Sequence, residues 1–202
     1  SFYNQTKDIG IKPTPAIGGV GLIKNYKKMI TMNFKEVDNI VLVIGKTEGH
    51  LDQSVFARDF LNEKNGPPPE INLFNEKNNG ETLLKLIEKD FIKSAHDVSL
   101  GGIIVAIAKM CIKANKGINF NKSKQLINMF EYFFGEDQGR YIIEISRDDL
   151  KKVTDILNKS SVHFDELGTI SEKELFFDEK TKVSIDELTV SNKDWLSKYM
   201  DK

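Results

Sequence analysis

The strongest constraint on the fold is a continuous apolar run, Ile40-Val41-Leu42-Val43-Ile44, which stops at Gly45. Four of its five residues are β-branched, and no polar residue interrupts it. A strand with one face in water would alternate apolar and polar residues, so this run predicts a strand covered on both faces. The chain is therefore expected to build a sheet with helices on it, with this strand near the sheet centre.

Strand and helix patterns alternate from about residue 40 to residue 170, and strand patterns then follow one another. This order predicts an α/β or α+β fold, a mixed β-sheet with helices packed on it. The predicted strands are 16–23, 40–44, a short strand ending at 96–97, 116–120, 141–145, 162–170, and a hairpin of 174–177 and 182–185. The predicted helices are 55–61, a helix whose first turn holds Glu81, one from residue 102 onward, 126–133, one after Ser146, and a last amphipathic helix with Trp195, Leu196 and Tyr199.

Composition narrows the classes of function. The chain has 202 residues and a net charge of -1, so it carries no basic field of the kind that holds nucleic acid, and no nucleic-acid partner is expected. No apolar run reaches the roughly 20 residues of a membrane helix, and no signal peptide is evident, so we expect no membrane association and a cytoplasmic location. The single cysteine, Cys111, excludes an internal disulfide and is expected to be an inert core thiol.

Residues 94–102 (SAHDVSLGG) are the strongest candidate for chemistry, because they read as strand, tight turn and helix start. A helix N-terminus presents free N–H groups and a positive dipole end, which suit a phosphate or a carboxylate. Asp97, at the end of the strand, is suited to hold a divalent metal or to orient a loop. The alternative is that the glycines only allow close packing and that the aspartate only caps the helix.

Three other features remain open on pattern alone. The glycines in residues 18–21 are suited either to cradle a phosphate or to allow close backbone packing. The polar stretch 136–140 (EDQGR) between two apolar elements is either a ligand-facing loop or a helix stop. The histidines, His50, His96 and His163, have separate contexts, and no nucleophile–base arrangement is evident.

Five segments, in chain order, resemble motifs of one family. Residues 1–6 and 13–21 (SFYNQT and PTPAIGGVG) resemble SxYNET…PTPxIGGVG, and residues 45–51 (GKTEGHL) resemble GxTxGxL. Residues 94–102 resemble HDVSxGG, and residues 134–141 (FGEDQGRY) resemble FGExQxRY. These are motifs of phosphoribosylformylglycinamidine synthase, a ligase of purine biosynthesis. Two positions depart from the pattern, since Gln5 and Leu100 stand where the family has acidic residues.

The resemblance implies a fold like the C-terminal domain of aminoimidazole ribonucleotide synthetase. It divides the chain into residues 1–32, the tail of a preceding ATP-binding-type domain, and residues 33–202, the C-terminal synthetase-like domain. It implies that the whole enzyme converts formylglycinamide ribonucleotide, ATP and glutamine-derived ammonia to formylglycinamidine ribonucleotide, ADP and phosphate. This chain would be a fragment, about the last quarter of such a subunit.

The resemblance also assigns site residues and cofactors. Ser1 matches a substrate-contacting serine, and Asp97 matches a position tied to Mg²⁺. Nucleotide or phosphate is expected close to His96, Ser99, Gly101 and Gly102. The family's catalytic histidine and most Mg²⁺ ligands lie upstream, so we expect no catalytic residue in this chain and no turnover by it alone.

Two alternatives stay open. Another member of the same superfamily, aminoimidazole ribonucleotide synthetase or selenophosphate synthetase, would share the fold, although residues 1–6 argue against both. A non-catalytic part would shape the site, hold an auxiliary nucleotide and dock the glutaminase. The expected partners are formylglycinamide ribonucleotide, ATP, a glutaminase subunit or domain and the upstream domains, with a homodimer possible through residues 1–32.

Overall fold

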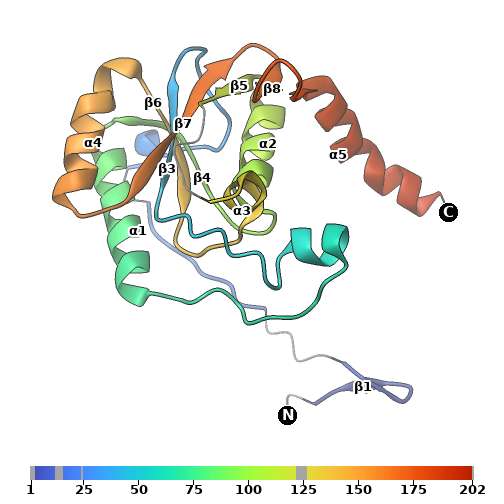
Figure 1. Cartoon of the computed structure of the whole chain (residues 1–202). Coiled ribbons are helices and arrows are strands. Elements are labelled where there is room, and N and C mark those ends of the chain that lie inside the picture. Colours follow the sequence, from blue (N-terminus) through green and yellow to red (C-terminus); the bar gives the residue numbers. More distant parts are fainter. Residues whose placement is uncertain (1–2, 12–15, 24, 122–126, 202) are drawn as a thin grey trace.

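The computed structural model describes residues 3–11, 16–23, 25–121 and 127–201. Its centre is a seven-stranded sheet in the order β4-β6-β3-β7-β5-β8-β9 (Figure 1). The strands are β3 (Ile40–Ile44), β4 (Ile92–Asp97), β5 (Gly117–Phe120), β6 (Tyr141–Ile145), β7 (Phe164–Ser171), β8 (Glu174–Phe176) and β9 (Lys182–Ser184). Strands β5 and β8 pair in parallel and the other neighbours pair antiparallel, so the predicted mixed sheet is confirmed.

Helices cover both faces of this sheet. They are α1 (Leu73–Glu88), α2 (Gly102–Ala114), α3 (Met129–Phe134), α4 (Leu150–Lys159) and α5 (Ile185–Met200). Short helices are also present: the 3₁₀ helices η1 (Tyr26–Lys28) and η3 (Arg147–Asp149), and the π-helix η2 (Ala57–Leu61), which lies within the predicted helix 55–61. Helices α1 and α4 lie on one face, and α2 and α3 lie on the other (Figure 1). Strand β3 is fully buried between these layers, as its apolar run predicts. Its side chains pack on both sides: Val41 and Val43 face α2, and Leu42 faces α1 and α4.

Helix α1 begins earlier than the sequence pattern predicts. We expected its first turn at Glu81, after Gly80, but the helix starts at Leu73 and contains both residues. The Asn72 side chain accepts the N–H of Asn75 at 3.0 Å and so caps the helix start. Gly80 is tolerated inside the helix, where it lies against the hydroxyl of Tyr141.

The predicted strand 16–23 is wrong. These residues form no strand, and the side chains of Ile17, Val20 and Leu22 are exposed. A strand needs a neighbour for its N–H and C=O groups, and no strand in the described part of the chain pairs with this segment. The regular structure before it is a small hairpin, β1 (Gln5–Thr6) with β2 (Ile9–Gly10), which is exposed as well.

Two helix starts also differ in detail from the predictions. Helix α3 begins at Met129 because Asn128 forms a capping box with Glu131; part of the predicted 126–133 helix, residue 126, lies outside the described residues. Ser146 does not cap a helix with its side chain. Its hydroxyl instead donates to Asp149 at 2.8 Å, and the single turn η3 precedes α4.

The C-terminal helix α5 is amphipathic as predicted, but only its start packs on the domain. Ile185 is buried and Leu188 packs against the core, whereas Trp195, Leu196 and Tyr199 are exposed. The later turns of α5 project from the body of the domain (Figure 1). Across the described ranges, no helix has the length and apolar content needed to span a membrane.

Candidate functional site

Three of the segments that resemble family motifs meet at one edge of the sheet. Strand β6 pairs antiparallel with both β3 and β4, and its first residue, Tyr141, lies opposite Ile44 and opposite Asp97. The loop after β3, the turn after β4 and the turn before β6 therefore come together. These segments are far apart in the sequence, so their meeting follows from strand pairing alone.

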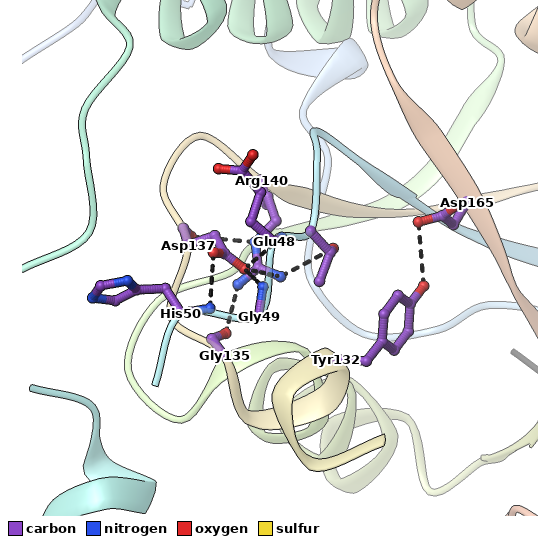
Figure 2. A network of polar contacts seen from close by, with 9 residues as sticks. Glu48, Gly49, His50, Tyr132, Gly135, Asp137, Arg140 and Asp165 are labelled. Atoms are coloured by element: carbon purple, nitrogen blue, oxygen red, sulfur yellow. Dashed lines mark hydrogen bonds and ion pairs between the residues drawn. The ribbon is translucent and has the colours of Figure 1, made fainter. Parts of the chain in front are cut away.

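The carboxylate of Asp137 holds the loop that follows β3. It accepts the backbone N–H groups of Glu48 at 3.2 Å, Gly49 at 3.1 Å and His50 at 3.1 Å (Figure 2). Asp137 is buried, and successive N–H groups that converge on one anion form a concave nest. This nest, with the charge of Asp137 in it, fixes the path of residues 48–50.

Arg140 supplies the opposite charge from inside the same turn. Its guanidinium is buried, lies 3.4 Å from the Asp137 carboxylate, and donates to the carbonyl oxygen of Gly135 at 2.6 Å and to the hydroxyl of Thr47 at 3.2 Å (Figure 2). Burial lowers the pKa of Arg140, while the neighbouring Asp137 carboxylate acts in the opposite direction. An arginine stays charged under such conditions, so the turn contains a buried ion pair.

Glu136 links the loop after β3 to the turn after β4. One oxygen of its carboxylate accepts the N–H of Val55 and the N–H of Gly101, both at 2.8 Å. Gly101 precedes α2, so the positive end of this helix already faces a protein carboxylate. The stretch 136–140, left open on pattern alone, thus ties together the loop after β3 and the turn after β4.

The turn after β4 is closely packed. A Cβ atom on Gly102 would lie 2.6 Å from the carbonyl oxygen of Phe133, and Gly101 and Gly102 both have positive φ. The N–H of Gly102 donates to the carbonyl oxygen of Ser99. Packing therefore accounts for both glycines, and the expected nucleotide contacts of Ser99, Gly101 and Gly102 stay predictions.

His96 and Asp97 lie side by side at the end of β4. The Nδ1 atom of His96 is 2.9 Å from an Asp97 oxygen, and the Asp97 side chain is 64% exposed. Burial raises the pKa of Tyr141, and the negative charges of Glu76 and Asp97 raise it further.

The described residues contain no group of three or more His, Cys, Asp and Glu side chains that could hold a metal. Mg²⁺ commonly binds one or two carboxylates together with waters and substrate phosphates. The exposed carboxylate of Asp97 fits such a partial site. Ser1, the predicted substrate contact, lies outside the described residues.

A cavity of about 860 Å³ opens beside this edge of the sheet. Its walls are the loop after β3, residues between Pro69 and Glu76 at the start of α1, and the turn Asp137–Gly139. Lys46, His50, Asn75 and Gln138 are among its polar lining residues. None of the predicted residues His96, Asp97, Ser99, Gly101 and Gly102 lines it. We did not predict the wall at the start of α1, although Asn72 before an apolar residue is a recognisable helix-start signal.

The chain belongs to the family described as "AIR synthase related protein, C-terminal domain", which matches residues 36–180. The fold agrees with solved structures of related proteins. "T. maritima PurL complexed with FGAR" matches with a TM-score of 0.67 at 16% identity, over 81% of this chain and 30% of that one. E. coli HypE, a hydrogenase maturation protein, matches with a TM-score of 0.56 at 15% identity, over 77% of this chain and 52% of that one.

Curated relatives place the chain more closely within the family. It is 75% identical over 201 residues to the phosphoribosylformylglycinamidine synthase subunit PurL of Pelagibacter ubique, and 38% identical over 204 residues to that of Bartonella quintana. Both alignments cover all of this chain but only 28% and 27% of the relatives. The predicted family resemblance and fold class are therefore confirmed, and the chain spans little more than a quarter of the relatives' length.

Proposed function

We propose that this chain is the C-terminal part of the synthetase subunit of phosphoribosylformylglycinamidine synthase. As part of the whole subunit it serves the conversion of formylglycinamide ribonucleotide, ATP and glutamine-derived ammonia to formylglycinamidine ribonucleotide, ADP and phosphate. The observation that carries this proposal is the 75% identity to the Pelagibacter ubique subunit along the whole chain. Solved PurL structures with ATP and with FGAR, both from T. maritima, add support.

The loop after β3, the turn after β4 and the turn before β6 meet at one edge of the sheet, which we call the motif edge. In this proposal the motif edge forms one wall of a ligand site. Asp97 provides one carboxylate toward Mg²⁺, Ser99 and the start of α2 lie near nucleotide, and Ser1 contacts the ribonucleotide substrate. Bound ATP would supply the phosphoryl group that activates the substrate amide for attack by ammonia. The groups of this chain bind and orient, and we assign no catalytic residue to it.

The domain division and the partners belong to the same proposal. Residues 1–32 are the tail of a preceding domain, which would explain why residues 16–23 expose apolar side chains. The glutaminase is a partner, as the solved "Structure of PurLQS from Thermotoga maritima" suggests for that relative. The cytoplasmic location stays a prediction.

A chimeric subunit tests the proposed function. In the Pelagibacter ubique subunit, the matching 201 residues are replaced by this chain. We expect formation of formylglycinamidine ribonucleotide that depends on ATP and ammonia, with a rate close to that of the unmodified subunit. An inactive but folded chimera would contradict the proposal. The isolated chain is the matched control and should show no turnover.

A second candidate function is the binding of a nucleotide by this chain alone, and it is supported by the polar side chains that line the cavity. Saturating ligand stabilises a native protein by roughly 2.7 kcal/mol at about a hundredfold excess over Kd. We would measure the thermal midpoint of the isolated chain with and without Mg-ADP and Mg-ATP. A rise in the midpoint that Lys46→Ala abolishes would support a nucleotide in the cavity, and a rise that Asp97→Ala abolishes would support one at the end of β4. No rise would exclude this function.

A further inference from the structure

Four phenylalanine rings pack against one another next to the motif edge. Phe56 has its ring centroid 5.4 Å from Phe60, 5.7 Å from Phe130 and 4.8 Å from Phe134. Phe60 belongs to η2, and Phe130 and Phe134 belong to α3, which lies beside η2 (Figure 1). Two elements from distant parts of the sequence therefore build one aromatic surface.

This surface faces outward. Phe60 is 74% exposed, Phe130 is 58% exposed and Met129 is 54% exposed, and Leu61 is exposed beside them. We call the six residues together the aromatic face: Phe56, Phe60, Leu61, Met129, Phe130 and Phe134. Contiguous apolar patches of this kind on a protein surface mark a place where another surface packs.

The aromatic face continues directly into the candidate site. Phe56 follows Val55, whose N–H is held by Glu136, and Phe134 precedes Gly135, whose carbonyl accepts from Arg140. A body that packs on the aromatic face would therefore also lie next to the motif edge.

The area of the face argues against a second copy of this chain as the occupant. Full burial removes roughly 150–250 Å² per aromatic side chain, so closing this face would bury on the order of 400 Å². Two copies would bury on the order of 800 Å² in total, which is below the roughly 1,200 Å² of a stable dimer. The same face packed on a complementary surface of another domain would also bury on the order of 800 Å² in total, which lies within the roughly 600–1,500 Å² of interfaces between domains of one chain.

We propose that the aromatic face is the docking surface for the rest of the full-length polypeptide, through a complementary apolar surface of that part. The inference rests on the proposed function, because it takes this chain to be part of a longer subunit. The length of the relatives supports the choice, since 72% of the Pelagibacter ubique subunit lies outside the match that covers 28% of it.

The test compares the same substitutions in two contexts. Phe60→Lys with Met129→Lys is introduced into the isolated chain and into the chimeric subunit described above, and the thermal midpoint of each is measured. Because both side chains are exposed in the isolated chain, we expect its midpoint to change little there. In the chimera the charges would be buried, so we expect a drop of several degrees and the loss of most activity. Leu84→Lys, at an exposed position of α1, is the control and should have the same small effect in both contexts.

Equal drops in both contexts would overturn the proposal, because the face would then be exposed in the full subunit as well. An isolated chain that sediments as a dimer, and becomes a monomer with the two lysines, would overturn it in favour of a second copy. If the doubly substituted chimera does not fold, Met129→Ser alone is the milder variant for the same comparison. An inactive unsubstituted chimera would refute the proposed function, while the difference in midpoints would still report on docking.

Discussion

The two ends of strand β6 hold buried carboxylates in two different settings. Before the strand begins, Asp137 accepts three backbone N–H groups and pairs with the buried Arg140. Near its end, Glu144 is completely buried and accepts the N–H groups of Lys35 and Glu36, together with side-chain donors from Asn39 and Ser94. Both carboxylates fasten a distant stretch of backbone to the sheet.

The difference between them lies in their surroundings. Asp137 lines the cavity and has a cationic partner, whereas all four donors to Glu144 are neutral and Glu144 is not among the residues that line the cavity. A buried carboxylate that holds backbone amides is therefore not by itself a sign of function. The cavity and the convergence of three motif segments mark the site. Glu144 makes the same kind of hydrogen bonds away from the cavity, where they stabilise the fold.

The largest effect is expected from Glu144→Gln. An amide keeps one acceptor oxygen but turns an NH₂ group toward two of the four donors, so buried donors lose their partner. We expect a loss of about 3 kcal/mol in the free energy of unfolding, measured by urea denaturation. Glu172→Gln, at an exposed position, is the control. A loss no larger than that of the control would show that Glu144 does not fasten residues 35–39.

A smaller loss is expected from Asp137→Asn, about 2 kcal/mol, because Asp137 keeps 8% of its surface exposed and accepts three backbone N–H groups, whereas Glu144 is completely buried with four donors. The Arg140 guanidinium would also lose its partner charge while remaining buried. Urea denaturation of the isolated chain measures the loss. An unchanged stability would mean that the buried ion pair contributes nothing to holding the loop after β3.

We expect Glu136→Gln to lower the free energy of unfolding by about 1 kcal/mol, less than Asp137→Asn does. The side chain is only partly buried, and its replacement keeps the oxygen that accepts from Val55 and Gly101. Removing the charge also removes its interaction with the N-terminal end of α2. The same urea titration measures it. A loss as large as that of Asp137→Asn would reverse the order of importance within this turn.

The smallest effect concerns a surface carboxylate, Asp149. Its hydrogen bonds with Lys152 and then with Ser146 hold its pKa below the usual range. A carboxyl whose pKa is lower in the folded state contributes stability above its unfolded-state pKa of about 3.9 and loses it as the pH falls through the folded-state pKa. Between about pH 6 and about pH 3, Asp149→Asn should therefore show a slightly shallower loss of stability than the unsubstituted chain. Identical pH profiles would contradict this assignment.

Much of the sheet could be predicted from the sequence because its strands carry local signals. The apolar run of β3, the strand that ends in His96 and Asp97, and the hairpin of β8 and β9 are all found where the pattern places them. The start of α2 followed from its glycines. In each case the information lies within a few neighbouring residues.

The rest depends on contacts that a local pattern does not contain. Residues 16–23 have the composition of a strand, but a strand forms only where another strand pairs with it. Glu136 could be recognised as part of a polar stretch, but its two donors, Val55 and Gly101, are brought together by strand pairing. Glu144 sits inside an apolar strand and gave no signal, because its donors come from two distant segments, residues 35–39 and strand β4.

The most direct test of this account is amide hydrogen exchange of the isolated chain, followed by NMR in the unsubstituted form and in Asp137→Asn. In the unsubstituted chain the amides of Glu48, Gly49 and His50 should exchange slowly, although they lie in a loop. In Asp137→Asn these three should exchange faster, while the amides of Lys35 and Glu36, held by Glu144, should keep their rates. Fast exchange at residues 48–50 in the unsubstituted chain, or equal acceleration at both places, would contradict the claim that the turn before β6 organises the site.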